Sequence, residues 1–359
     1  MQQPKELSGP NVRQDVLAPA GVIALPGVQG RMDHMAADVQ GKRLFVTGLE
    51  NHSLEVVDLA QGKLVRSIGG IKEPQGLLYL PQARQILVCS RGDGTCRSFD
   101  ADTFAEGPWV DLGTNADNIR FDASSKTVYV GSGGEPGPGG LSAIDMPSLL
   151  PQAKGGAPKP ERSPADLLLT NPGRFDPKAA IELKSHPESF QVSPDGHRVY
   201  VNVPDEHCVA VIDVTAQGMK LSATWPVELQ RNFPMVIDPQ SPRLFVICRK
   251  PAKVLCYDRQ TGKVESSADC VGDCDDAFYD ANLGRLFVIG GEGFVDVFSV
   301  DPKTSALSRT ARLATAPRAR TALYVPQLHL LCVAAPAVEK GPQARILLFQ
   351  VPPAPISGK

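Results

Sequence analysis

Polar and titratable side chains recur at one point of an internal repeat in this chain of 359 residues. Each repeat carries an apolar triplet such as LFV at residues 44–46, and counting back from the triplets brings one residue of every repeat to an equivalent position. These residues are Asp33, Gln75, Asp117, Glu188, Phe233, Asp275 and Arg320. The residues that follow them are His34, Gly76, Asn118, Ser189, Pro234, Asp276 and Thr321. Crowded carboxylates repel one another unless a cation or shared protons offset the repulsion, so the set is interpreted as functional rather than as ordinary turn residues.

Two metal chemistries are open for these residues. Calcium takes roughly six to eight oxygen ligands, and it can polarise an ester or lactone carbonyl while His34 or His186 acts as general base. The candidate calcium ligands are Asn118, Glu188, Asn232 and Asp276. Alternatively, His34, His186 and neighbouring carboxylates bind zinc, copper or iron, although the histidines show no ligand spacing such as HExxH.

Two arginines before the last repeat suit an anionic group on a substrate. A planar guanidinium binds a carboxylate or phosphate through two parallel hydrogen bonds, so Arg318 and Arg320 can form such a clamp or can neutralise the acidic ring. With His34 and His186, Arg320 is assigned to catalysis. The candidate substrate-binding residues are Asp33, Gln75, Asp117, Asp275 and Arg318. Arg91 and Arg249 lie in hairpins on the same face, where they are expected to form a solvated rim.

The elements that must position these residues are short strands. The chain contains 33 Gly, 32 Pro and only 6% aromatic residues, a balance typical of many strands joined by turns. Seven repeats follow one another at a spacing of about 40 residues, which is typical of propeller blades. Their inner hairpins are expected at 35–46, 77–88, 119–130, 190–201, 235–246, 277–288 and 322–333. The sequence therefore predicts an all-β, seven-bladed β-propeller whose inner strands bring the polar residues together around the mouth of an axial channel.

The two ends of the repeat region predict how the propeller closes. The segment GVIALPGV (21–28) precedes the first repeat, and RILLFQV (345–351) ends the last repeat without a fourth strand. The N-terminal strand is expected to complete the last blade, because closure removes exposed sheet edges. A single domain then spans 21–351, between a flexible segment (1–20) and a tail (352–359). Residues 146–178 are expected to form a surface insertion in the third blade, between its third and fourth strands.

Composition and charge exclude two classes of partner. Lys plus Arg (37) and Asp plus Glu (39) nearly balance, so a cationic surface for nucleic acid is not expected. No run approaches the roughly 18 apolar residues of a membrane-spanning helix. A monomer is the default expectation. Three cysteine pairs are candidate disulfides if the protein is exported, namely Cys89/Cys96, Cys248/Cys256 and Cys270/Cys274.

The repeats resemble those of the YVTN family of seven-bladed propellers, which includes the YncE-type proteins. The resemblance rests on segments such as RVYVNVPDEHCVAVIDV (198–214) and RLFVTGLENHSLEVVDLAQGKLVRSI (43–68), and it spans 21–351. The Pro-x-Gly turn that commonly opens such blades is kept as Pro74-Gln75-Gly76, whereas several other repeats carry titratable groups there. The resemblance implies a periplasmic or secreted protein whose signal peptide is not part of this sequence. Its relatives range from binding proteins to lactonase-like and lyase-like enzymes.

The sequence thus favours a small polar substrate at the axial mouth, acted on by metal-assisted hydrolysis of a lactone or ester or by lyase chemistry. The alternative is a non-catalytic propeller that binds a protein, a peptide or a component of the cell envelope. An exposed apolar patch on one face, together with a channel plugged by hydrogen-bonded side chains, would favour that alternative.

Overall fold

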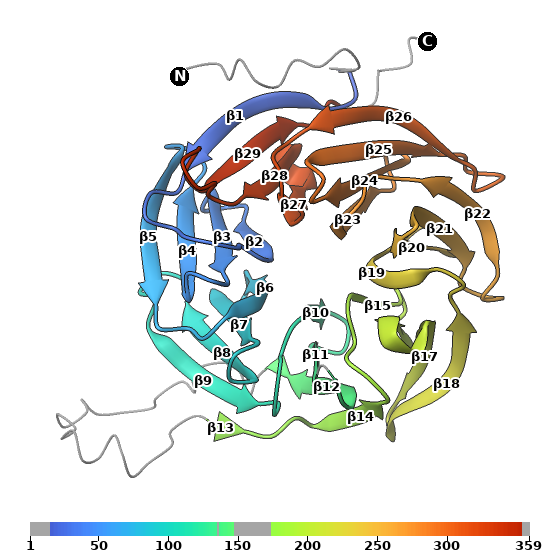
Figure 1. Cartoon of the computed structure of the whole chain (residues 1–359). Helices are drawn as coiled ribbons and strands as arrows, with labels where there is room; N and C mark the ends of the chain where they lie inside the picture. Colours follow the sequence, from blue (N-terminus) through green and yellow to red (C-terminus); the bar gives the residue numbers. More distant parts are fainter. Residues whose placement is uncertain (1–14, 135, 147–173, 354–359) are drawn as a thin grey trace.

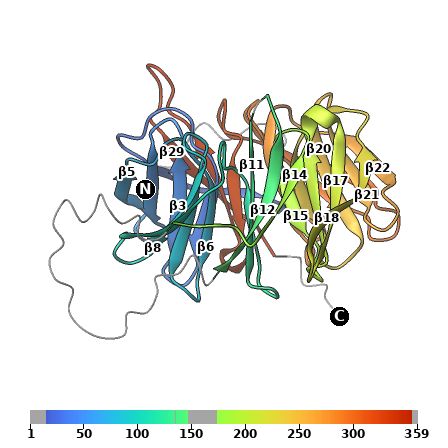
Figure 2. The same cartoon turned by 90° about the horizontal axis from the view of Figure 1, so that it is seen from below.

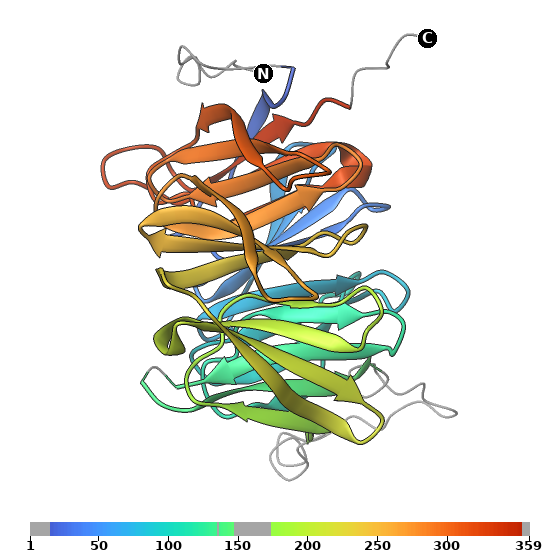
Figure 3. The same ribbon diagram turned by 90° about the vertical axis from the view of Figure 1, so that its right-hand side faces the viewer.

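Seven β-sheets, six of four antiparallel strands and one with an additional fifth strand, surround a central axis and form a closed β-propeller (Figure 1). A computed structural model describes residues 15–134, 136–146 and 174–353. Viewed edge-on, the strands run between the two faces of a disc, so the connecting loops gather on those faces (Figures 2 and 3). The predicted fold class, with seven blades in a ring, is confirmed.

Each blade starts with the strand nearest the axis and ends with an outer strand. Blade one consists of β2 (Met35–Asp38), β3 (Arg43–Gly48), β4 (Ser53–Asp58) and β5 (Lys63–Gly69). Blade two consists of β6 (Pro74–Leu80), β7 (Gln85–Ser90), β8 (Thr95–Asp100) and β9 (Glu106–Asp111). Blade three consists of β10 (Ile119–Asp122), β11 (Thr127–Gly133), β12 (Gly139–Asp145) and β14 (Ala179–Leu183).

The remaining blades repeat this order. Blade four consists of β15 (Phe190–Val192), β16 (Arg198–Val203), β17 (Cys208–Thr215) and β18 (Gly218–Pro226). Blade five consists of β19 (Gln230–Ile237), β20 (Arg243–Lys250), β21 (Ala252–Asp258) and β22 (Val264–Asp269). Blade six consists of β23 (Cys274–Asp280), β24 (Arg285–Gly290), β25 (Phe294–Val300) and β26 (Leu307–Ala314). Single-turn 3₁₀ helices lie at Pro204–Glu206 and Pro326–Leu328.

The N-terminal strand closes the ring, as the sequence predicts. Blade seven contains β27 (Ala322–Val325), β28 (Leu330–Ala335) and β29 (Arg345–Gln350), and β1 (Ala18–Ala24) adds to it as the outer strand. β1 pairs with β29 in antiparallel register, from Ala18 opposite Gln350 to Ala24 opposite Arg345. The strand starts three residues earlier than the predicted segment at 21–28. Segments from the two ends of the chain thereby share one sheet (Figure 1).

The apolar triplets form the packing between blades. The middle residue of a triplet is fully buried, and in three places its ring contacts a tyrosine on the inner strand of the next blade. The ring centroids are 5.5 Å apart for Phe45 and Tyr79, 5.0 Å for Phe245 and Tyr279, and 5.2 Å for Phe287 and Tyr324. Tilted pairs at these separations add to the burial energy, and their recurrence holds each blade at a similar angle to the next.

The third blade contains the predicted interruption. β12 ends at Asp145 and β14 starts at Ala179, so the connection joins the third and fourth strands of this blade. Residues 147–173 of the predicted insertion lie outside the described residues, as do 1–14 and 354–359 of the predicted end segments. One feature was not predicted: β13 (Arg174–Phe175) pairs in parallel with β9 and adds a fifth strand to blade two (Figure 1).

All eight cysteines are free thiols in the structure. Cys89 and Cys96 lie directly opposite each other on β7 and β8. The proposed pairing of Cys248 with Cys256 is wrong, because Cys248 lies opposite Lys253 while Cys256 lies opposite Phe245. No helix in the described part of the chain is long and apolar enough to cross a membrane.

Candidate functional site

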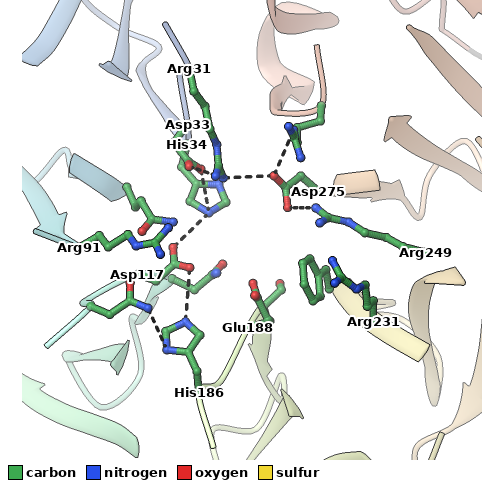
Figure 4. A pocket seen from close by; sticks show the side chains of 16 residues that line it. Arg31, Asp33, His34, Arg91, Asp117, His186, Glu188, Arg231, Arg249 and Asp275 are labelled. Carbon is green, nitrogen blue, oxygen red and sulfur yellow. Dashed lines mark hydrogen bonds and ion pairs between the residues drawn. The ribbon is translucent and has the colours of Figure 1, made fainter. Parts of the chain in front are cut away.

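A cavity of about 240 Å³ opens at the mouth of the axial channel. All seven residues that the repeats place at the equivalent position line it (Figure 4). The residues that line the cavity are Arg31, Asp33, His34, Gln75, Arg91, Asn115, Asp117, Asn118, His186, Glu188, Ser189, Arg231, Phe233, Arg249, Asp275 and Arg320. At about 30 Å³ per water molecule, the space suits a small metabolite.

Irregular strand pairing directs these side chains toward the axis. In three blades the register shifts where the inner strand begins, between Pro74 and Leu77, between Asn232 and Met235, and between Cys274 and Asp276. A bulge of this kind re-aims side chains, and it directs Gln75, Phe233 and Asp275 into the mouth.

Blade two approaches blade three closely at the mouth. A Cβ at Gly76 would lie 1.9 Å from the carbonyl oxygen of Asp117. Only glycine allows this approach, which brings the backbone of the second blade against the residue that carries a cavity carboxylate.

A chain of ion pairs crosses the mouth between blades one, five and six. The Arg31 guanidinium lies 2.7 Å from Asp33 and 3.4 Å from Asp275. Arg249 Nη2 lies 2.5 Å from Oδ1 of Asp275, and its Nε donates to the carbonyl oxygen of Cys274 at 2.6 Å. The Arg249 guanidinium also lies 4.0 Å from the centre of the Phe233 ring, a cation–π contact. The expectation that Arg249 belongs to a solvated rim is therefore wrong, since its side chain is only 11% exposed.

His34 is surrounded by carboxylates. Its Nδ1 lies 3.6 Å from Asp276, and its Nε2 lies 3.7 Å from Asp33 and 3.8 Å from Asp117. Burial on its own lowers the pKa of His34, but Asp276, Asp33 and Asp117 raise it to about 10. At neutral pH His34 is therefore an imidazolium, which can donate hydrogen bonds but cannot accept a proton.

Asp33 holds a proton more readily than an ordinary aspartate. Its side chain is almost fully buried, and burial raises its pKa to about 6, against the opposing charges of Arg31 and His34. Burial also raises the pKa of Asp275, although Arg249 and Arg31 oppose that shift. A carboxyl group that titrates near pH 6 can exchange a proton with a ligand under ordinary conditions.

His186 and Asp117 form a second acid–base pair. Nδ1 of His186 lies 3.1 Å from the carbonyl oxygen of Gly133, and a carbonyl oxygen can only accept a hydrogen bond. Nδ2 of Asn115, which can only donate a hydrogen bond, lies 3.4 Å from the same Nδ1, and Nε2 faces Asp117 Oδ2 at 3.8 Å. Burial raises the pKa of Asp117, but the neighbouring His186, His34 and Arg31 outweigh burial and lower it. Asp117 is thus a carboxylate that orients two histidines.

The two arginines of the predicted clamp separate. Arg320 lines the cavity and contacts Asp273 at 3.0 Å and Asp275 at 4.0 Å. Arg318 is exposed and is not among the residues that line the cavity. Its backbone adopts φ 65° and donates to the carbonyl oxygen of Gly291 at 2.7 Å. The pair does not form a joint clamp in this structure.

The four candidate calcium ligands do not share one point. Asn118 and Glu188 line the mouth, whereas Asp276 lines a deeper cavity and accepts a hydrogen bond from the backbone nitrogen of Ala322 at 2.9 Å. The Asn232 side chain is fully buried between blades four and five, where it donates to Asn202 and to the carbonyl oxygen of Cys208, each at 3.0 Å. Among the described residues, no group of three His, Cys, Asp or Glu side chains is arranged to hold a metal ion.

Sequence reasoning missed three cavity residues that a simple rule would have found. Arg31, Asn115 and Arg231 lie two residues before the equivalent position, as His186 does, and all four line the cavity. Arg91 and Arg249 each follow a triplet by three residues and reach the mouth from the adjoining hairpin. The same counting from the triplets, extended in both directions, identifies them.

The cavity wall is rich in cations. Five arginines and the protonated His34 face it, against the four carboxylates of Asp33, Asp117, Glu188 and Asp275. The carboxylates of Asp33, Asp117 and Asp275 contact Arg or His side chains. Arg91 and Arg231 project toward the axis from opposite sides of the mouth, with Glu188 between them (Figure 4). Within the described residues, no carboxylate forms an ion pair with Arg231.

Comparisons with known proteins identify the fold and nothing finer. No protein-family model matches the chain, and no curated protein sequence matches it. One similar solved structure is described as Kuenenia stuttgartiensis hydrazine synthase, with a TM-score of 0.67 and 16% identity over 88% of this chain and 96% of that chain. Another belongs to a mitotic checkpoint complex, with a TM-score of 0.70 and 11% identity over 98% of this chain and 97% of that chain. At such identities the likeness shows the propeller fold and does not carry an activity.

Proposed function

We propose that the axial mouth binds a small organic acid and acts on it by acid–base chemistry, as a lactone or ester hydrolase or as a lyase. The observation that carries the proposal is the set of five arginines around one cavity of about 240 Å³. Guanidinium groups recognise carboxylates through paired hydrogen bonds, and a partly dehydrated cavity strengthens that attraction. Arg231 is assigned the leading role because it faces the cavity without a carboxylate partner among the described residues.

Asp33 lies across the mouth from Arg231, and His186 lies on the neighbouring blade (Figure 4). Asp33, with its pKa near 6, can deliver or remove a proton, and His186 lines the same cavity as a second acid–base group. The cationic His34 and the arginines stabilise negative charge that develops on a carbonyl oxygen or a carboxylate. These roles support hydrolysis of a lactone or ester, or removal of a proton next to a carboxylate followed by elimination.

The same contacts favour an organic anion over a metal ion at the mouth. A calcium ion needs several carboxylate or carbonyl oxygens directed at one point, yet Asp33, Asp117 and Asp275 are directed at arginine or histidine nitrogens. A metal-assisted route remains a prediction from the sequence, and no step of the proposed reaction depends on it.

The non-catalytic alternative receives less support from the surface. The large exposed apolar residues of the described part of the chain are spread over blades one, four, five and seven, in β5, β18, β22 and β1 and in the loop before β29. They are Val22, Val65, Leu221, Val264 and Val338. Binding of a protein, a peptide or an envelope component by one face stays a prediction.

We also infer, from the repeats alone, kinship with the YVTN and YncE-like propellers and a periplasmic or secreted location. Fractionation of cells that express the complete gene tests the location. Recovery of the protein only with cytoplasmic markers would contradict it.

A thermal-unfolding screen tests the binding proposal. We expect di- and tricarboxylates and sugar acids to raise the melting temperature of the wild type, because a ligand that binds only the folded state stabilises it. Arg231→Met should no longer be stabilised by these acids. Lys250→Met removes a charge from the adjoining hairpin, outside the cavity wall, and should still be stabilised by them. Lactones and hydroxy acids that stabilise the protein are then assayed for turnover with Asp33→Asn and His186→Gln. Stabilisation that survives Arg231→Met unchanged would refute the assignment.

A further inference from the structure

A second and larger cavity occupies the axial channel beneath the mouth. Its volume is about 410 Å³, within the range of roughly 300 to 1,000 Å³ that is typical of small-molecule pockets. His34, Ser189 and Asp275 line both cavities and therefore form the wall between them. The proposed function makes no use of the deeper cavity.

The strand register explains why this cavity is mostly apolar. On each inner strand, one residue lies opposite the middle residue of the triplet, and its place on the innermost strand brings it to the border of the cavity. These residues are Ala36, Leu78, Arg120, Gln191, Val236, Phe278 and Leu323. All seven line the cavity, and all except Ala36 are only partly buried. Five of the seven are apolar, so most of the blades present hydrocarbon to the channel, and Arg120 and Gln191 interrupt it on blades three and four.

Arg120 is the only arginine or lysine among the described residues that line this cavity. Its guanidinium donates to the carbonyl oxygen of Ile119 at 2.8 Å, and more weakly to Ser189 at 3.3 Å and Asn118 at 3.5 Å. No carboxylate of the described part of the chain lies within 4.0 Å of it. Burial lowers the pKa of Arg120, although Asp276 and Asp117 oppose that shift from a distance. The guanidinium also lies 5.7 Å from the centre of the Phe190 ring, and the carboxylates that line this cavity, Asp275 and Asp276, do not contact it. A buried cation that no carboxylate contacts is stabilised by an anion that binds to it.

We propose that the axial channel binds a monocarboxylate with an apolar chain or aromatic ring, its carboxylate on Arg120 and its apolar part against Leu78, Phe278 and Leu323. The planar guanidinium provides two parallel donors for the carboxylate, and the apolar wall excludes water around the chain. Ligands that carry charge along their whole length do not suit this wall. The site differs in ligand class from the mouth, where several charged groups alternate around a small space.

Calorimetric titration of the full chain with 3-phenylpropanoate and octanoate tests the proposal. The matched uncharged probes are 3-phenylpropanol and octanol. We expect saturable 1:1 binding of the acids, with the alcohols at least about tenfold weaker because they lack the charge-assisted hydrogen bonds. Arg120→Met keeps an apolar wall but removes the cation. It should weaken the binding of both acids by a similar factor. Arg84→Met removes the same charge from an exposed site and serves as control.

A second variant guards against an Arg120 substitution that disturbs the fold. Leu78→Trp fills the channel from blade two and leaves every charged side chain of the cavity in place, and it should also abolish binding of 3-phenylpropanoate. Circular dichroism and the melting temperature verify that each variant is folded. The proposal is overturned if neither acid binds at millimolar concentration, if alcohol and acid bind equally, or if folded Arg120→Met and Leu78→Trp retain wild-type affinity. Loss of organic-acid binding at the mouth in Arg231→Met, with unchanged 3-phenylpropanoate binding, would show that the two sites are separate.

Discussion

Nδ1 of His34 lies 3.6 Å from Oδ1 of Asp276, in a place where neither group is well hydrated. Asp276 Oδ2 is held at the same time by the backbone nitrogen of Ala322, so the carboxylate is fixed from both sides. The pair connects blade one to blades six and seven, and it keeps His34 protonated. The histidine therefore contributes a fixed positive charge to the mouth rather than a base.

We predict that Asp276→Asn lowers the pKa of His34. Asp276 is the strongest of the charges that raise it to about 10, and its removal leaves burial to act in the other direction. The expected change is about 1 to 3 units, measured by following the His34 ring resonances through a pH titration. A titration midpoint that stays near 10 would show that Asp33 and Asp117 are enough to keep His34 protonated without Asp276.

The stability of the protein should fall at alkaline pH because of the same group. The pKa of His34 is about 10 in the folded state and near 6.5 in the unfolded chain, so its stabilising contribution is complete below pH 6.5. It is lost as the pH rises toward 10. We expect the free energy of unfolding of the wild type to decline across that interval more steeply than that of His34→Gln. Parallel curves for the two proteins would contradict the prediction.

Anion binding at the mouth should strengthen as the pH falls through 6. Asp33 has a pKa of about 6, and its protonation removes one negative charge from the cavity wall. Below that pH we expect a few-fold tighter binding of an organic acid that stays ionised. Asp33→Asn should bind with the low-pH affinity throughout. The comparison uses calorimetry at pH 5.5 and 7.5, and an equal pH dependence in both proteins would exclude Asp33 as the titrating group.

Gly76→Ala should destabilise the protein by about 1–3 kcal/mol and should weaken ligand binding. The added methyl group would meet the Asp117 carbonyl oxygen at 1.9 Å, so blades two and three must move apart at the mouth. Gly69→Ala is the matched control, since nothing lies within 4 Å of its Cβ position and its backbone is an ordinary strand. Chemical denaturation of both variants provides the measurement. Equal stability would show that the mouth tolerates the displacement.

The thiols should be almost unreactive in the folded protein. Burial raises the pKa of Cys248 and Cys332 to about 12, and the thiolate is the reactive form. We expect a disulfide reagent at pH 8 to modify no thiol of the folded protein rapidly except that of the half-buried Cys208. After unfolding without reductant, the same reagent should modify all eight thiols. Fewer than eight would reveal a disulfide, for which Cys89 and Cys96 are the best-placed pair.

The sequence alone was sufficient to predict the architecture and many of the residues at the mouth. The triplets repeat at a fixed spacing, and inner strands of a propeller must converge, so Asp33, Asp117 and Asp275 could be placed together before any coordinates. Closure by the N-terminal strand followed from an unpaired edge.

The chemistry of the mouth could not be predicted in the same way. His34 suggested a base because its type is visible in the sequence, while the three carboxylates that keep it protonated come from three different blades. Asn232 suggested a ligand, yet the register shift in β19 directs it between blades. A shift of one residue at a bulge decides which way a side chain points, and the repeat pattern in the sequence does not show where such a bulge occurs.

The most direct test of an anion-binding mouth is a calorimetric titration of the purified wild type with citrate and, separately, with calcium chloride. Citrate should bind saturably with one site per chain, Arg231→Met should abolish that binding, and calcium should produce no saturable heat. Stoichiometric calcium binding together with no response to citrate or to any other organic acid would contradict the account and restore the metal-centred hypothesis.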